Sequence, residues 1–213
     1  MLLKSDIRKI LKKELGAFLK TYGYKPQAKE SGFIRKTKEG NTQIGISIVD
    51  YRPKFLLGIP FSIRLEAVEK ISNYLFNTMP EYQSETTTIV VPGKFFTGID
   101  EYKITNVEGL QEFIDFFKKL YTGKVDYFLS NNSTLQGIVE TLFTQHIEFG
   151  KIFQHYDFIT RIIIARLGKI EHYDFVAEKY YKIYCENYPD SKEEQAEIRR
   201  AIEYLKTVNP DKA

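Results

Sequence analysis

The sequence predicts an α+β protein in which an antiparallel sheet of four to five strands is covered by helices and is followed by an all-helical C-terminal half. Apolar residues change from helical spacing to alternation between residues 23 and 65, and no segment after residue 124 has strand character. Hydrophobic residues make up 43% of the chain and charged residues 28%. These values are typical of a folded globular domain.

Residues 5–22 are expected to form the first helix. Ser5 is a preferred N-cap residue, and Asp6 suits the positive end of the helix dipole. Gly23 is expected to end the helix. The apolar stripe of this helix consists of Ile7, Ile10, Leu11, Leu15, Phe18 and Leu19.

Alternating segments predict the strands of the sheet. The first is GFIRKTK (32–38), and the isoleucines of TQIGISIVDY alternate with smaller or polar residues. LGIPFSIRL then places every second residue on one apolar face, and TTTIVVP and EYKIT are shorter candidates. Because Pro60 cannot donate a ladder hydrogen bond, its strand is expected at an edge or with a bulge.

Two further helices are expected in the first part of the chain, at 65–76 and 107–121. Thr105 and Glu108 have the spacing of a capping box that would open the second of them. Together with helix 5–22, these two helices are expected to cover one face of the sheet.

The C-terminal half is expected to be helical throughout. A composition shift at Ser130-Asn131-Asn132-Ser133 marks the best boundary. It separates an α+β domain (1–130) from a helical region (131–213) packed on it, unless the two form one continuous domain. The expected helices fall near 124–130, 134–153, 157–168, 171–187 and 192–207.

Charge, cysteine content and the lack of long apolar runs indicate in which cellular compartment the protein is expected. The net charge is +3, but residues 1–40 hold eleven Lys/Arg and four Asp/Glu. A single cysteine, Cys185, rules out an internal disulfide and suits a reducing compartment. No apolar stretch of signal-peptide length follows the start, and no run approaches the roughly 20 apolar residues of a membrane helix. We therefore expect a cytoplasmic protein with no membrane partner.

The stretch QHIEFGKIFQHYDF (145–158) raises the question of a metal or acid–base site. In a continuous helix His146 and Glu148 point about 200° apart, and His155 lies roughly 10 Å along the axis from Glu148. One zinc ion needs ligands about 2 Å away, so these residues cannot share it unless Gly150 breaks the helix. The expectation is a helix with polar residues, without metal or cofactor.

Enzyme motifs are absent from the sequence. It contains no phosphate loop, no dinucleotide fingerprint and no nucleophile elbow. Cys185 lies in an expected helix, where a structural thiol is the commoner role. The sequence thus favours a protein that is not an enzyme, although a hydrolase with a site of dispersed carboxylates, histidines and tyrosines stays an alternative.

The expected hairpin contains basic residues close to an aromatic one. Arg35, Lys36 and Lys38 follow Phe33, and basic residues combined with exposed aromatics on a sheet can bind nucleic acid. Nucleic-acid binding through the basic N-terminal segment is therefore the second alternative.

The N-terminal arrangement has a recognisable order. It runs LKKELGAFLKTYGYKP, then SGFIRKTKEG, then a strand pair and IPFSIRLEAVEKI. Over about residues 5–120 it resembles uncharacterised bacterial domain-of-unknown-function families in which a first helix ends in a Gly-Phe or Gly-Tyr pair and a meander follows. Some of these families are associated with toxin–immunity loci. The resemblance implies an α+β fold and carries no catalytic residue.

Residues 158–189 resemble a tetratricopeptide-type helical pair. Ala177, Tyr181 and Pro189 have the spacing of the small, aromatic and closing proline positions of that repeat. Gly168 lies too close to the turn for the first helix of the repeat, and no second copy follows. We therefore expect an antiparallel helical hairpin and no solenoid.

The absence of a catalytic motif, the Tyr-rich helices and the uneven charge favour a non-catalytic protein-binding module of immunity or accessory type. Its partner would be another protein. In helix 171–187 an apolar stripe that begins at Tyr173 should face the core, and Phe175 points roughly 200° away from Tyr173. The candidates for partner contact are Phe175, which could instead pack under helix 192–207, and the flanking Tyr181 and Tyr188.

Overall fold

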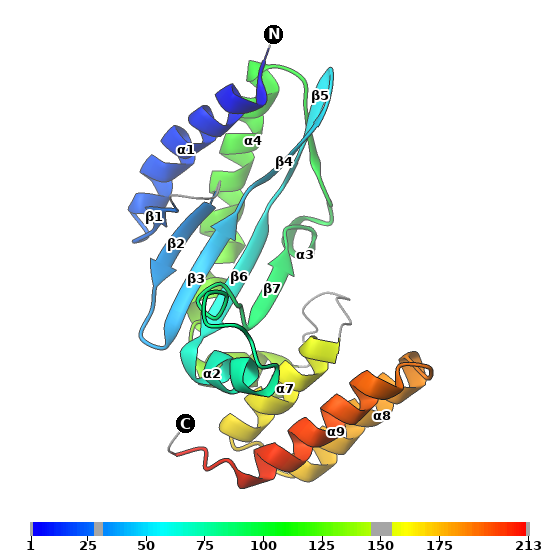
Figure 1. Cartoon of the computed structure of the whole chain (residues 1–213). Helices are drawn as coiled ribbons and strands as arrows, with labels where there is room; N and C mark the ends of the chain where they lie inside the picture. The colour runs from blue at the N-terminus through cyan, green and yellow to red at the C-terminus, as the bar shows by residue number, and fades with distance from the viewer. Residues whose placement is uncertain (1, 28–31, 146–154, 212–213) are drawn as a thin grey trace. The chain divides into compact units, whose positions relative to one another are not determined.

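The computed structural model of the chain describes residues 2–27, 32–145 and 155–211 and confirms the α+β class (Figure 1). The chain forms two compact units, residues 1–63 with 89–133 and residues 64–88 with 134–213. Residues 64–88, which the sequence placed with the sheet, thus belong to the second unit. The strands are β1 (Lys25–Pro26), β2 (Gly32–Lys36), β3 (Gly40–Gly45), β4 (Ser47–Tyr51), β5 (Lys54–Gly58), β6 (Pro60–Leu65), β7 (Ile89–Pro92) and β8 (Tyr102–Ile104).

Helices make up the remainder of the regular structure in the described residues, and two of them, η1 and η2, are single π-helical turns. The helices are α1 (Lys4–Lys20), α2 (Glu66–Leu75), α3 (Lys94–Thr97), α4 (Val107–Leu120), η1 (Tyr121–Val125), α5 (Asp126–Asn131), α6 (Leu135–Val139), η2 (Glu140–Thr144), α7 (His155–Leu167), α8 (Tyr173–Asn187) and α9 (Lys192–Thr207).

The first unit contains two antiparallel sheets that share one long hairpin. Five strands follow the order β1-β2-β3-β6-β7, and three follow the order β4-β5-β8. The hairpin passes from one sheet to the other between β3 and β4 and again between β5 and β6. At this passage Gly45 lies against Pro60, and a Cβ on the glycine would come within 2.9 Å of the proline Cγ. Only glycine permits so close an approach.

Pro60 was expected in an edge strand or at a bulge, and the edge position was wrong. It is the first residue of β6, which lies between β3 and β7. A proline is tolerated at the first residue of a strand because the missing N–H falls outside the regular ladder.

One face of the five-stranded sheet forms the core of the first unit. Its buried side chains include Phe33, Ile44, Phe61 and Val91, and α1 and α4 lie side by side along the sheet (Figure 1). Register places Ile34 opposite Gln43 and Ser62 opposite Val90 on the other face, where these side chains are at least partly exposed. The third helix expected to cover the sheet, α2, instead contacts α7 in the second unit.

The N-caps of two expected helices are shifted, by two residues in α1 and by one residue in α4. Helix α1 begins at Lys4, and the Asp6 carboxylate accepts a hydrogen bond from the Leu3 N–H at 3.2 Å, so Ser5 is not the N-cap. Helix α4 is capped by Asn106, whose Oδ1 accepts the Gly109 N–H at 2.9 Å. The proposed capping box at Thr105 was therefore wrong, although α4 itself is confirmed.

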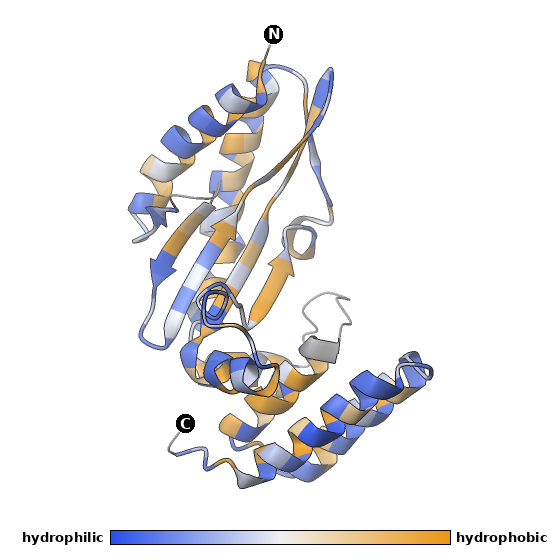
Figure 2. Cartoon of the chain, viewed as in Figure 1, coloured by the Kyte–Doolittle hydropathy of each residue, from blue (hydrophilic) through white to orange (hydrophobic). Residues whose placement is uncertain are grey.

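The second unit is built around α7. Its residues from Phe158 to Ala165 are all buried, as expected for a helix with neighbours on every side. In this unit α7 contacts α2, α6, α8 and α9, and Figure 2 shows it as largely hydrophobic. The expected helices 157–168, 171–187 and 192–207 are confirmed as α7, α8 and α9. Of the expected helix 134–153, only residues up to 145 are described, as α6 and η2.

We expect Gly168→Ala to destabilise the protein, because α6 approaches the end of α7 at this glycine. An added Cβ would overlap the Val139 Cγ2 and lie 3.0 Å from the Ile164 carbonyl oxygen. Overpacking of this kind costs about 1–3 kcal/mol, measurable by urea unfolding. Gly123→Ala is the control, since no heavy atom lies within 4 Å of its added Cβ. Adding Val139→Ala to Gly168→Ala should recover part of the loss; no difference between the glycine variants would contradict the crowding.

Candidate functional site

The most distinctive polar arrangement in the described residues surrounds Arg64, near the end of β6. Its side chain is only 8% exposed. Its Nε and Nη2 donate to the two carboxylate oxygens of Glu66 at 2.8 and 3.0 Å. Its Nη1 donates to the carbonyl oxygens of Gln83 and Thr86 at 2.9 and 2.6 Å. The guanidinium therefore binds the Glu66 carboxylate in the bidentate geometry for which arginine is suited. Its remaining nitrogen, Nη1, holds two points of a loop about twenty residues further along the chain.

Glu69 and Thr88 extend the polar network of Arg64. Both are buried, and the Thr88 hydroxyl donates to Glu69 Oε1 at 2.7 Å while accepting the Leu65 N–H at 2.9 Å. Glu69 Oε2 lies 4.0 Å from Arg64 Nη1. The buried carboxylate thus has both a hydrogen-bond donor and a cation beside it, as burial of a charge requires.

The segment held in this way is residues 77–88, which we call the Arg64 loop. It begins at Asn77, whose φ of 48° is in the left-handed region that asparagine tolerates better than most residues. The Gln83 side chain donates to the Thr78 carbonyl oxygen at 2.8 Å and so closes the loop on itself. With partners at Gln83, Thr86 and Thr88, the loop is fixed at several points although residues 79–85 are exposed.

Large apolar side chains are exposed on this loop and on the helix before it. Tyr74 in the last turn of α2 is 67% exposed, and Met79 and Tyr82 in the loop are 60% and 53% exposed. The Tyr74 ring lies 5.0 Å from the ring of Tyr204 in α9. We call Tyr74, Met79 and Tyr82 the Tyr74–Tyr82 surface. Tyrosine and methionine are residue types enriched in protein–protein interfaces.

Carboxylates lie next to this surface in the chain. Glu81 and Glu85 are exposed in the same loop, and the Glu66 side chain is 61% exposed. The hydrogen bond from Arg64 lowers the pKa of Glu66 below its usual value, so this carboxylate stays ionised under neutral conditions. In the chain, the apolar side chains of this surface are thus accompanied by exposed carboxylates, and we call Glu66, Glu81 and Glu85 its acidic border.

The structure separates the three partner-contact candidates of α8. Phe175 is 70% exposed and does not pack under α9. Tyr181 is half-buried, with the Arg199 guanidinium 3.8 Å above its ring. Tyr188 is half-buried and stacks on Tyr184 at 4.8 Å. Tyr181 and Tyr188 thus make contacts inside the second unit, and only Phe175 presents most of its side chain.

The three nucleic-acid candidates of the hairpin differ in exposure. Arg35 Nη1 donates to Asp126 at 3.1 Å, and its guanidinium lies 4.9 Å from the centre of the Tyr24 ring. Only 17% of the Arg35 side chain is exposed, so its role is structural. Lys36 and Lys38 are exposed, but Phe33, which would have supplied an aromatic platform, is buried.

The expectations about metal chemistry fall partly outside the described residues. His146, Glu148 and Gly150 are not among them, and the side chain of His155 is not described. Within the ranges that the structure describes, no group of three His, Cys, Asp or Glu residues could hold a metal ion. Cys185 is a half-buried free thiol. Across the same ranges no helix is long and apolar enough to cross a membrane.

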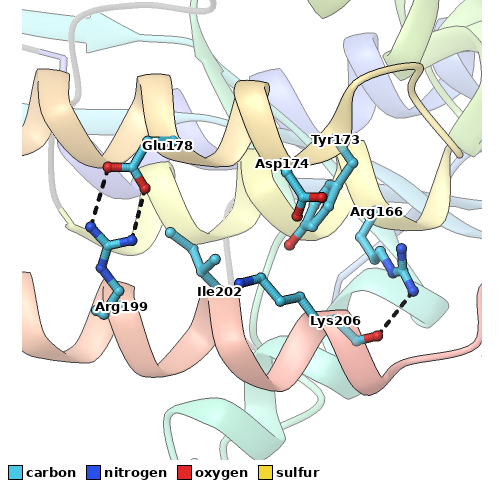
Figure 3. Close-up of a pocket in the computed structure, with 7 residues that line it drawn as sticks. All are labelled: Arg166, Tyr173, Asp174, Glu178, Arg199, Ile202 and Lys206. Atoms are coloured by element: carbon cyan, nitrogen blue, oxygen red, sulfur yellow. Dashed lines mark hydrogen bonds and ion pairs between the residues drawn. The ribbon is translucent and has the colours of Figure 1, made fainter.

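A groove of about 610 Å³ lies between α8 and α9 (Figure 3). Its charged side chains are largely engaged with the protein itself. Arg199 makes a bidentate pair with Glu178 at 2.7 and 3.3 Å, and Arg166 donates to the carbonyl oxygens of Lys206 and Val208. These contacts cap the end of α9 and join it to α8 and α7. The groove is therefore a packing boundary between helices, and its charged groups serve the fold.

Tyr173 lines this groove with its hydroxyl buried and without a hydrogen-bond partner among the described residues. Burial raises the pKa of its phenol to about 12, and the nearby carboxylates of Asp174 and Glu203 add to this effect. An unfolded tyrosine ionises near pH 10. The free energy of unfolding is therefore unaffected by ionisation of this group below about pH 10, and it falls as the pH rises to about 12 because the unfolded phenol ionises first.

Comparison of the chain with protein-family models, with curated proteins and with solved structures finds no match. The geometry of the chain itself is therefore the basis for any functional argument.

The Arg64 loop was not identified from the sequence. The loop partners of Arg64 lie 19 and 22 residues away along the chain, and no local pattern connects them to it. One signal was present: the segment NTMPEYQSE places a methionine and a tyrosine among polar residues with no helical or strand period. Such residues cannot form a buried face, so their exposure could have been inferred.

Replacing Arg64 with lysine tests whether this residue holds the loop. Lysine keeps the charge but cannot donate to Glu66, Gln83 and Thr86 together. We expect the free energy of unfolding to fall by roughly 3 kcal/mol and the amide hydrogens of residues 77–88 to exchange faster. Arg52→Lys is the control, because Arg52 is 66% exposed and, among the described residues, pairs with Asp50 alone. Unchanged exchange in the loop would show that Arg64 does not order it.

Removing the Tyr173 hydroxyl tests whether this group lacks a hydrogen-bond partner or instead makes a stabilising hydrogen bond. Tyr173→Phe should leave the free energy of unfolding unchanged or raise it, because no hydrogen bond is lost. Tyr184→Phe is the matched variant, since the Tyr184 hydroxyl donates to Glu194 at 3.0 Å, and it should cost about 1 kcal/mol. Chemical unfolding at neutral pH measures both. A larger loss for Tyr173→Phe would reveal a partner for its hydroxyl.

Proposed function

We propose that this chain is a non-catalytic protein-binding module, of immunity or accessory type, that contacts its partner through the Tyr74–Tyr82 surface. The observation that carries the proposal is the Arg64 loop. It holds two large apolar side chains more than half exposed, next to a third at the end of α2. Solvent exposure of apolar groups that are fixed in position is typical of binding sites.

The anchoring of the loop bears on affinity. A flexible loop loses conformational entropy when a partner immobilises it, and a loop that is already held loses less. Arg64 fixes residues 83 and 86, and Thr88 and Glu69 fix the return to β7. Tyr82 and Met79 are therefore presented on a preorganised segment, which favours their use as contact anchors.

The acidic border indicates the kind of partner surface. Glu66, Glu81 and Glu85 would repel an acidic protein and attract a basic one. The partner that fits is a protein with apolar pockets for a tyrosine and a methionine, surrounded by lysine or arginine residues.

The proposal is tested by comparing variants in their native cell extract. Tagged wild-type protein should retain one stoichiometric protein partner, and Tyr74→Ala with Tyr82→Ala should lose it while the melting temperature changes by less than about 2 °C. Calorimetry with the purified partner should show an affinity loss of at least tenfold, corresponding to about 1.4 kcal/mol.

Phe175→Ala is the matched control, because Phe175 is an exposed aromatic of the same unit outside the loop. Its affinity for the partner should equal that of the wild type. If Phe175→Ala weakens binding and the double variant does not, the contact surface lies on α8. If the wild type retains no stoichiometric protein, the chain is not a protein-binding module.

A further inference from the structure

Helix α1 in the first unit presents a row of cations to solvent. The row consists of exposed Arg8, Lys9, Lys12, Lys13 and Lys20, and we call it the α1 cation row. Within the described part of the chain, its members make one ion pair, between Lys13 and Glu14 at 3.6 Å. The first unit carries 18 Lys/Arg and 11 Asp/Glu, whereas the second carries 13 and 17. The positive charge of the protein is thus concentrated in the first unit, and largely on this helix.

The buried side of α1 limits what the helix can bind. Ile7 and Leu15 are fully buried, and Leu11 is 2% exposed, so the apolar stripe is committed to the core. An amphipathic helix that lies in a bilayer surface needs that stripe for the acyl chains. Insertion of α1 into a membrane surface is therefore excluded while the first unit is folded.

The exposed side of α1 lacks the anchors of a protein interface. Between Lys4 and Lys20 it presents no exposed aromatic or large aliphatic side chain. Lysine is depleted in the centres of protein interfaces, where aromatic and apolar residues supply most of the affinity. A surface of lysine without anchors suits an extended polyanion, in which each cation meets a phosphate and releases counterions.

The spacing of the row fits a strand of phosphates. Residues four apart on a helix are separated by about 6 Å along its axis, which applies to the pairs Arg8–Lys12 and Lys9–Lys13. One strand of a duplex carries a phosphate about every 3.4 Å of its axis. Flexible lysine side chains can therefore each reach a different phosphate of the same strand.

The carboxylates of the neighbouring helix α4 would repel a flat anionic surface more than a narrow polyanion. Helix α4 lies beside α1 on the same face of the sheet (Figure 1) and carries the exposed carboxylates Glu108, Glu112 and Asp115. A flat anionic membrane would meet these carboxylates together with the cation row. The convex backbone of a duplex touches a narrow strip and can avoid them.

We propose that the α1 cation row binds the phosphate backbone of double-stranded nucleic acid without reading its base sequence. Arg35 and Lys36 of the hairpin are not part of this surface. Arg35 is engaged with Asp126, and Lys36 shares the opposite face of the sheet with Ile34, because residues two apart in β2 point to the same side. The inference is independent of the proposed protein partner, since α1 and the Tyr74–Tyr82 surface belong to different units.

The test measures binding of the full chain to a fluorescent duplex of about 24 base pairs by anisotropy, between 50 and 200 mM NaCl. With four or five phosphates neutralised, the logarithm of the binding constant should fall with the logarithm of salt at a slope of about −4, or roughly a 200-fold loss over this range. A duplex of unrelated sequence should bind with the same affinity.

Lys9→Glu with Lys13→Glu should weaken binding at least tenfold at 100 mM NaCl and make the salt slope shallower by about two. Lys36→Glu with Lys103→Glu changes the net charge equally at exposed positions outside α1, and it should bind within about twofold of the wild type. Melting curves of both variants verify that they are folded.

The inference is overturned if the wild type fails to bind the duplex at 50 mM NaCl, or if the two double variants lose affinity equally. Two competitors distinguish the other polyanions. Vesicles of phosphatidylserine and phosphatidylcholine, or poly-glutamate, should bind more weakly than the duplex at equal charge concentration. Tighter binding to either would assign the row to a membrane surface or to an acidic protein instead.

Discussion

The arrangement of residues 64–88 depends on one buried guanidinium. Arg64 follows Ile63, the last residue of the first unit before the chain enters the second. Its guanidinium makes five hydrogen bonds to Glu66, Gln83 and Thr86, which take the place of hydrogen bonds to water. Burying a charge costs several kcal/mol unless partners surround it. The chain meets that requirement by folding the Arg64 loop back onto the Arg64 side chain. In doing so it fixes a segment in which residues 79–85 are all exposed.

The same requirement explains why the loop can expose apolar residues. Tyr82 and Met79 are not needed to hold residues 77–88 in place, because polar contacts at Gln83, Thr86 and Thr88 do so. A segment stabilised by its backbone carbonyl groups leaves its side chains available for a partner. The groove between α8 and α9 shows the opposite case. There Arg166, Glu178 and Arg199 bind one another or backbone groups, and their charges are used within the fold.

Two surfaces of different chemistry result, one in each unit. The Tyr74–Tyr82 surface is apolar with an acidic border, whereas the α1 cation row is basic and lacks apolar anchors. Protein interfaces gain affinity from desolvated aromatic and apolar groups, and polyanion binding gains it from counterion release. The two proposals therefore rest on different physical bases of recognition, one in each unit.

The sequence by itself determined the elements whose residues interact locally. Helices α1, α4, α8 and α9 follow from apolar spacing, and β2 from alternation, because neighbours three, four or two residues apart decide those patterns. Only the tertiary structure decided which elements meet. The apolar face of α2 would suit a sheet or a helix equally, and it packs on α7. From the sequence, Arg35 is expected to be a solvated cation of a hairpin. In the structure its guanidinium instead donates to Asp126, which is far away in the sequence. Arg64 gains its role from carbonyl groups about twenty residues away, and such contacts depend on the path of the backbone, which no local residue pattern encodes.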